Sequence, residues 1–297
     1  MNIFSMIPTI MMVVSPILIT AVGGMICERS GVVNVALEGL MSIGACSAAC
    51  VACLMQFAGA GSYSVWVAVL CAMLISGVMS LIHAVAAIDM KADQTISGTG
   101  INLLADGLTI FACQVLFGMD RTDAIPIKMV SDKLGFYPSF YISLFVVVLS
   151  WFVLFKTPFG MHLRACGEHP AAADSVGINV RRVRYTGVFL SGVCAGLAGA
   201  CAVFTQTIQF TASLVGGRGF IALAAVAFGR WNPWGVLGAS VLFGASQALA
   251  VILSGSSIPA EVFNIVPYAI TLIALIIFSG KDYAPRSAGI PYTKSSS

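Results

Sequence analysis

Two pairs of polar residues stand inside long apolar stretches of the chain. Asn102 and Asp106 are four residues apart, and so are Asn34 and Glu38. A spacing of four places two side chains on one face of a helix, where amide and carboxylate groups can exchange hydrogen bonds with a polar solute. Ionisable groups inside a bilayer are costly and commonly mark transport pathways. We therefore name Asn34, Glu38, Asn102 and Asp106 as candidate substrate-pathway residues.

A packing role explains the same residues without a transported solute. Asn102 and Asp106 would then bond to a neighbouring helix, and such a bond contributes roughly 0.6 kcal/mol on average. Glu38 lies about two turns into its apolar segment, from where it could pair with Arg29 or cap the cytoplasmic end of the helix. We expect the isolated His83 to be a hydrogen-bonded interfacial residue. Residue types and spacing leave both interpretations open.

A second polar feature is the segment 156–184, which interrupts the apolar sequence and carries seven Lys, Arg and His residues. Pro170 suits the first position of a helix and Gly177 suits its end, which predicts a short helix between them. A helix of about two turns is unstable alone in water, so it needs a docking surface. The alanines from Ala171 to Ala173 would allow a partner to approach closely. Composition alone is equally consistent with an ordinary loop.

The composition determines the class of protein that must hold these features. Of 297 residues, 59% are hydrophobic and 9% are charged, whereas soluble domains carry about 25% charged residues. So few charges cannot cover a water-facing surface, and the chain must be an integral membrane protein. The net charge of +3 is scattered without a basic and aromatic patch, which argues against a nucleic-acid partner.

The apolar stretches predict an all-α polytopic fold. A helix needs about 20 apolar residues to cross a hydrocarbon core about 30 Å thick. The shortest predicted span could be re-entrant, so we expect about eight to ten transmembrane helices. The predicted spans are 5–26, 32–57, 63–88, 96–118, 138–155, 186–207, 215–229, 233–254 and 261–279.

The positions of the basic residues predict which loops face the cytoplasm. With the N-terminus outside, the inner loops hold 11 of the 15 Lys and Arg residues, as the positive-inside rule requires. The loop 156–185 is then cytoplasmic. Residues 1–280 form one transmembrane domain, and residues 281–297 form a polar cytoplasmic tail that we expect to be disordered.

Nine cysteines lie almost entirely in apolar segments. Cys46, Cys50 and Cys53 share one helix face. Cysteine packs well as a small apolar side chain, and a structural metal site needs a closed set of ligands that this stripe does not supply. We therefore expect no metal site.

Three stretches match, in order and spacing, a family of membrane transport subunits. They are 28–45, which reads ERSGVVNVALEGLMSIGA; 159–180, which contains GEHPAAADSVGIN; and 219–244, which begins GFIALAAVAFGRWNPWG. With DQTISG at 93–98, the match spans nearly the whole chain. The chain resembles permease subunits of bacterial ABC importers of the simple-sugar and nucleoside family, a ribose-type family similar to branched-chain amino acid permeases.

This resemblance implies a role for the short cytoplasmic helix. It would be the coupling helix that seats in a cleft of a cytoplasmic ABC ATPase. The chain contains no GxxxxGK[ST] motif, so it lacks the loop with which P-loop proteins bind nucleotide. The resemblance assigns no cofactor and no catalytic residue to this chain, since ATP and magnesium would bind the partner. The implied ATPase-coupling residues are Gly167, Glu168, Pro170, Ala171, Ala172 and Gly177.

The resemblance also implies the function. The chain would import a solute across the bacterial cytoplasmic (inner) membrane by alternating access. Its partners would be the ATPase, a second permease subunit in a heterodimer, a substrate-binding lipoprotein outside the cell and membrane lipids. The EGLM sequence that starts at Glu38 is similar to the nucleoside-type branch, which implies a purine nucleoside-like cargo. Ribose, galactose and riboflavin are alternative cargoes.

A second class of function is an ion-coupled secondary transporter that uses Asp106 as its ion site. Transport that follows an ion gradient without an ATPase would favour it. An intramembrane enzyme is a third class, but Asp106 and His83 lie on different predicted spans without a second catalytic group beside either.

Overall fold

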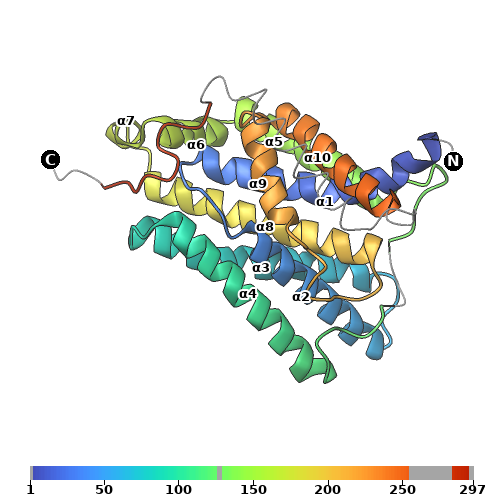
Figure 1. Cartoon of the computed structure of the whole chain (residues 1–297). Coiled ribbons are helices and arrows are strands. Elements are labelled where there is room, and N and C mark those ends of the chain that lie inside the picture. The colour runs from blue at the N-terminus through green and yellow to red at the C-terminus, as the bar shows by residue number, and fades with distance from the viewer. Residues whose placement is uncertain (1–2, 126–128, 254–282, 294–297) are drawn as a thin grey trace.

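A computed structural model describes residues 3–125, 129–253 and 283–293 (Figure 1). Apart from one isolated bridge between Arg121 and Thr211, the regular elements in these ranges are helices. The predicted ninth span, 261–279, lies outside the described residues. The helices are α1 (Ile3–Arg29), α2 (Leu37–Phe57), α3 (Ser64–Ala84), the π-helical turn η1 (Val85–Asp89), α4 (Gln94–Phe117), α5 (Pro138–Lys156), α6 (Pro158–Glu168), α7 (Pro170–Ser175), α8 (Val180–Gln206), α9 (Arg218–Phe228) and α10 (Pro233–Leu253).

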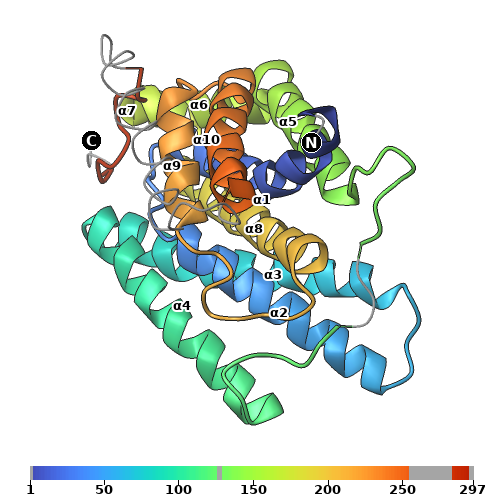
Figure 2. The same cartoon turned by 45° about the vertical axis from the view of Figure 1, so that its right-hand side comes forward.

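Six described helices are long and apolar enough to cross a membrane. This result confirms the prediction of an all-α polytopic membrane protein. Helix α8 lies at the centre, packed against α1, α2 and α3, while α4 and α5 lie at the edges of the bundle (Figure 2). The six segments are Met6–Arg29, Leu37–Phe57, Ser64–Asp89, Gln94–Phe117, Pro138–Lys156 and Val180–Gln206.

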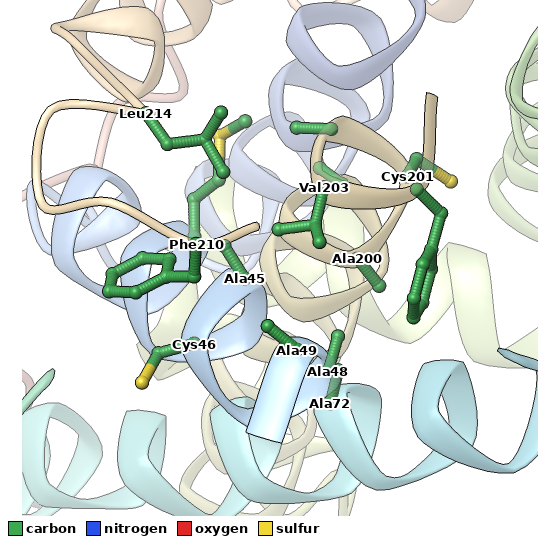
Figure 3. Packing of buried hydrophobic residues seen from close by; sticks show 14 of the residues in the cluster. Ala45, Cys46, Ala48, Ala49, Ala72, Ala200, Cys201, Val203, Phe210 and Leu214 are labelled. Carbon is green, nitrogen blue, oxygen red and sulfur yellow. The ribbon is translucent and has the colours of Figure 1, made fainter. Parts of the chain in front are cut away.

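Small residues allow the central helices to approach one another closely. A Cβ added to Gly44 of α2 would lie 2.5 Å from Cα of Gly196 in α8, and one added to Gly196 would lie 2.4 Å from the carbonyl oxygen of Ala72 in α3. Figure 3 shows Ala48 and Ala200 in the same interface. Membrane helices associate through close packing of this kind, which explains how α8 contacts three neighbours at once.

The two ends of the bundle carry different connections. At one end, α6, α7 and residues 283–293 gather (Figure 1), and Arg29 at the end of α1 lies 4.0 Å from Glu168. At the other end, the backbone N–H of Thr122 donates to the carbonyl of Phe210. The basic loops predicted to be cytoplasmic therefore meet at one end of the protein.

Two predicted spans differ from the structure. The predicted second span, 32–57, starts too early, because residues 31–36 are not helical and α2 begins only after them. The predicted seventh span, 215–229, contains α9, which has 11 residues. A helix of that length is about 16 Å long, roughly half the thickness of the hydrocarbon core. Helix α2 thus starts after an unwound segment, and α9 is too short to cross the membrane alone.

Candidate functional site

The unwound segment, residues 31–36, runs through the bundle without helical hydrogen bonds of its own. Unpartnered backbone groups are costly in a membrane, and neighbouring helices supply the partners here. The backbone N–H of Val33 donates to Oε1 of Gln94 at 2.7 Å, and its carbonyl oxygen lies 3.0 Å from Nε2 of His83. Nδ1 of His83 lies 3.0 Å from Oγ of Ser97. The expected hydrogen-bonded role of His83 is confirmed.

Asn34 and Asn102 complete this set of partners. Nδ2 of Asn102 donates to the carbonyl of Val35 at 3.0 Å, and its Oδ1 accepts from the N–H of Gly39 at 2.8 Å. Nδ2 of Asn34 donates to Oγ of Ser191 in α8 at 2.7 Å. Both amides are buried and bond to the chain itself. The structure thus gives them a structural role, and solute binding by either amide stays a prediction.

The expected shared helix face of Asn34 and Glu38 is wrong, because Asn34 precedes α2. The chain leaves α1 at Gly31, whose φ of +96° is a left-handed conformation that glycine adopts easily. Helix α4 then approaches the unwound segment closely, since a Cβ added to Gly98 would lie 2.7 Å from Cβ of Val35. Side chains larger than hydrogen at these glycines would displace the segment.

Glu38 holds the start of α9. Its Oε1 accepts from the backbone N–H of Gly217 at 2.7 Å, and its Oε2 accepts from that of Gly219 at 2.6 Å. A carboxylate is favourable there because the first N–H groups of a helix lack partners and carry a partial positive charge. The expected pairing of Glu38 with Arg29 is wrong, since Nε of Arg29 donates to the carbonyl of Trp231 at 3.0 Å.

Two more charged groups lie close to Glu38. Asp106, near the middle of α4, and Arg218, the first residue of α9, both interact electrostatically with it. The guanidinium of Arg218 donates to Oε1 of Gln206 at the end of α8. We call Glu38, Asp106, Gln206 and Arg218 the mid-span cluster. It joins the starts of two helices to polar groups of both signs inside the membrane.

The polar side chains along α4, at spacings of three and four residues, fall into two groups. Asn102, Thr109 and Cys113 are buried, whereas Thr99 and Asp106 are exposed. Lipid cannot solvate a carboxylate in the middle of an apolar helix, so such groups face a water-filled cavity or another protein. The exposed position of Asp106 favours a pathway over packing within this chain.

Sequence reasoning missed Gln94 and Gly217 as members of this region. Gln94 belongs to the DQTISG stretch, but nothing in its type showed that it would bond to a segment some sixty residues earlier. The available signal for α9 was the run Gly-Gly-Arg-Gly at 216–219, since glycines and a charge interrupt an apolar stretch. That pattern is typical of a helix that begins inside a membrane protein.

The cytoplasmic end contains the predicted short helix. Helix α7 begins at Pro170 and is preceded by α6, a helix that the sequence did not predict. Gly177 has a φ of +85° and donates its N–H to the carbonyl of Asp174 at 3.0 Å, so it ends the helix as expected. Helix α6 starts where Thr157 Oγ1 accepts from the N–H of Gly160 at 3.2 Å. The two helices form one docked unit.

Gly167 and Glu168 attach this unit to the membrane helices. A Cβ added to Gly167 would lie 2.3 Å from the carbonyl oxygen of Arg29, so only glycine allows α6 to lie directly on the end of α1. The carboxylate of Glu168 lies 4.0 Å from the guanidinium of Arg29. A displacement of α6 would therefore shift the end of α1, where the chain enters the unwound segment.

Helix α7 presents small side chains to the outside of the protein. Ala171 and Ala172 are exposed, and Val176 is 74% exposed. Ala173, in contrast, is buried against Cys166. A small apolar surface in a cytoplasmic loop suits a protein partner, and the coupling role of Ala171, Ala172 and Pro170 stays a prediction.

The described part of the C-terminal tail, residues 283–293, packs against this unit, so the expectation of a disordered tail is wrong for these residues. The N–H of Ser287 donates to the carbonyl of Gly167 at 2.8 Å. Nη1 of Arg184, a buried residue of α8, donates to the carbonyl of Ile290 at 3.0 Å. The tail thus joins the short helices to the start of α8.

Tyr292 of the tail packs against the apolar cluster that contains Cys166. Both belong to a small apolar cluster with Ala173 and Val180, and the thiol of Cys166 is fully buried. Burial raises the pKa of Cys166 to about 11, since a thiolate is poorly solvated there. The thiol is therefore a chemical reporter of whether the tail is in place.

Comparison with known proteins shows the family to which the chain belongs. A family described as branched-chain amino acid transport system / permease component matches residues 6–275. The chain belongs to this permease family. It is 43% identical to the guanosine ABC transporter permease protein NupQ of Bacillus subtilis, covering 97% of this chain and 96% of that protein. It is 39% identical to the nucleoside ABC transporter permease protein NupC of Lactococcus lactis, covering 95% and 94%.

A third relative is more distant. The guanosine ABC transporter permease protein NupP of Bacillus subtilis is 25% identical, covering 92% of this chain and 80% of that protein. Family membership and the six membrane-spanning helices make the protein a multi-pass transport subunit of the cytoplasmic membrane. The predicted permease resemblance is confirmed.

Proposed function

We propose that this permease moves nucleosides into the cell as one subunit of an ATP-driven ABC importer. The observation that carries the proposal is 43% identity to a guanosine permease over nearly the full length of both chains. A second permease named for nucleosides is similar at 39%. A purine nucleoside offers several hydrogen-bonding groups and little charge, which suits a pathway that contains both carboxylate and guanidinium groups.

We assign ATP hydrolysis to a separate cytoplasmic ATPase, which binds ATP and magnesium. The exposed face of α7 supports this assignment because Ala171, Ala172 and Val176 form a small apolar surface on a docked helix. Closure of the ATPase would displace α7 and α6. The contact of Gly167 with Arg29 would transmit this displacement to the end of α1.

The remaining partners are a second permease and an extracytoplasmic binding lipoprotein. The Bacillus subtilis relatives NupQ and NupP are both named guanosine permeases, and this chain is much more similar to NupQ. This difference supports a heterodimer in which the present chain occupies one position. The exposed side of α4 beside Asp106 is the part of the surface that we assign to the pathway between the two permeases.

Reconstituted transport tests the function directly. Proteoliposomes would contain this chain, the second permease and the ATPase, with the binding lipoprotein added outside. We expect uptake of labelled guanosine that requires ATP and is blocked by excess unlabelled nucleoside. Ribose, galactose or riboflavin uptake without guanosine uptake would overturn the assigned cargo. Uptake by the permeases alone, driven by an ion gradient, would overturn the ATP-driven mechanism.

A further inference from the structure

We propose that Cys46, Cys50 and Cys113 form a binding site for a soft monovalent metal ion of the Cu(I) class, which would fasten α4 to α2. The three Sγ atoms all lie within 4.8 Å of one another. Sγ of Cys46 lies 3.9 Å from that of Cys50 in the next turn of α2 and 3.9 Å from that of Cys113 in α4. The sequence alone placed Cys46, Cys50 and Cys53 on one helix face and predicted no metal site, and Cys113 joins Cys46 and Cys50 only through the packing of α4.

The distances suit three-coordinate binding. A metal–sulfur bond of about 2.3 Å in a planar trigonal site places neighbouring sulfur atoms about 4.0 Å apart. The two separations from Sγ of Cys46 are 3.9 Å, and all three sulfur atoms lie within 4.8 Å of one another, so side-chain rotation alone would bring them to that value. Three thiols on two helices can therefore surround one ion as the bundle stands.

The ligand set selects the ion. The cluster contains only sulfur ligands, and Cys53 does not add a fourth, since its Sγ lies 3.5 Å from the carbonyl of Asp123. Zinc prefers four ligands, and calcium and magnesium prefer oxygen. Thiolates favour Cu(I). The carbonyl oxygen of Thr109 lies 3.7 Å from Sγ of Cys46, well beyond the length of a metal–oxygen bond.

The proton balance is simple. Sulfur binds the ion as a thiolate, so each thiol that becomes a ligand loses its proton to water as the ion enters. No electron is transferred, because the ion arrives as Cu(I). Binding by all three sulfurs should release about three protons per ion and should therefore strengthen as the pH rises.

The position of the site gives binding a mechanical consequence. Figure 3 shows Cys46 on a different side of α2 from Ala48 and Ala49, which pack toward the bundle centre. Helix α4 lies at the edge of the bundle against α2 (Figure 2). Its other side is exposed at Leu103 and Phe111. An ion held by both helices would stop α4 from moving relative to α2.

The test uses the purified full-length protein in detergent, so it does not depend on the proposed transport function. Cu(I) is titrated against a chromogenic Cu(I) chelator under a reducing, oxygen-free atmosphere. We expect one tight site that Cys113→Ser and Cys50→Ser each weaken at least about tenfold, since even an indirect change at a metal site costs 10–100-fold. Cys201→Ser, a buried cysteine of α8 outside the cluster, is the matched control and should bind as the wild type does.

Two results would overturn the site. One is equal binding by the wild type and by Cys113→Ser. The other is equal loss in Cys201→Ser, which would show scattered thiols rather than one site. Because a variant could misfold, thermal unfolding is measured alongside: Cu(I) should raise the Tm of the wild type and of Cys201→Ser but not that of Cys113→Ser or Cys50→Ser. Absence of a Cu(I)-dependent shift in a folded wild-type protein contradicts the proposal.

Discussion

The unwound segment and the mid-span cluster lie side by side but use polar residues in opposite ways. Around residues 31–36, the amides of Asn34, Gln94 and Asn102 bond to the backbone or to Ser191 and are buried. In the mid-span cluster, Asp106 is exposed on the side of α4. The first group replaces the hydrogen bonds of a missing stretch of helix, and the second leaves charge available to something outside this chain.

This difference shows that a polar residue inside a membrane protein is not by itself a pathway residue. A buried amide that bonds to two backbone groups cannot be changed without leaving both unpaired. An exposed carboxylate can be changed with little cost to the fold. Substitutions can therefore separate the two regions by whether they reduce stability or transport.

The largest effect is expected from Asn102→Ala. The substitution leaves the carbonyl of Val35 and the N–H of Gly39 without their side-chain partner. An unsatisfied buried group costs about 1–3 kcal/mol, so we expect a loss of roughly 2–4 kcal/mol in the free energy of unfolding. Thermal unfolding in detergent measures it. Asp106→Ala is the matched control on the same helix, and an equal loss there would remove the distinction between the two regions.

The next largest effect is expected at the cytoplasmic end, from Ala172→Trp. Ala172 is exposed on α7, so the protein should fold normally while the bulky ring blocks the ATPase from seating. We expect ATP-driven uptake to fall by about tenfold or more, equivalent to about 1.4 kcal/mol of lost coupling, while the lipoprotein still binds solute. Val130→Trp, at an exposed position of the opposite end, controls for bulk. Normal uptake by Ala172→Trp would show that α7 does not contact the ATPase.

A smaller effect is expected from Asp106→Asn, which tests whether the mid-span cluster takes part in transport. The amide keeps the size and one acceptor of the carboxylate but removes its charge. We expect uptake to show a KM about three- to tenfold higher, with an unchanged Tm. Thr99→Val, another exposed polar position of α4 one turn or more away, is the control. Unchanged uptake kinetics in Asp106→Asn would return this residue to a packing role with a neighbouring protein.

Much of this arrangement follows from the sequence, and the rest depends on contacts between distant segments. Apolar length predicts the long helices, and Pro170 with Gly177 predicts α7, because both signals are local. Glu38 is different: its role depends on Gly217 and Gly219, which no local pattern connects to it. The start of α2 was misplaced for the same reason, since residues 31–36 are as apolar as a helix.

The C-terminal tail shows most clearly which contacts the sequence could not predict. Its composition is polar and contains prolines, as disordered termini often do, yet residues 283–293 pack on the protein. The contacts that hold it, from Ser287 to Gly167 and from Ile290 to Arg184, involve mainly backbone atoms of the tail. Hydrogen bonds made by backbone atoms depend little on the residue type, so residue types alone could not predict them.

The smallest effect on transport is expected from removal of the tail, residues 283–297. The buried Arg184 loses the carbonyl of Ile290, and the apolar cluster that contains Cys166 loses Tyr292. Since α6 keeps its direct contact with α1 through Gly167, ATP-driven uptake should fall only about two- to fivefold. Cys166 should become reactive, because solvent access lowers its pKa from about 11 toward the ordinary thiol value near 8.5.

A membrane-impermeant maleimide at pH 8 measures this change in purified protein. Truncation should add one labelled thiol per chain, and the added label should vanish when Cys166→Ser is combined with the truncation. Labelling that appears equally in the full-length chain would show that the tail does not cover Cys166. A truncation that exposes Cys166 but leaves uptake unchanged would show that the tail protects the short helices without helping to transmit movement, and the coupling route would then run through the contact of Gly167 with Arg29 alone.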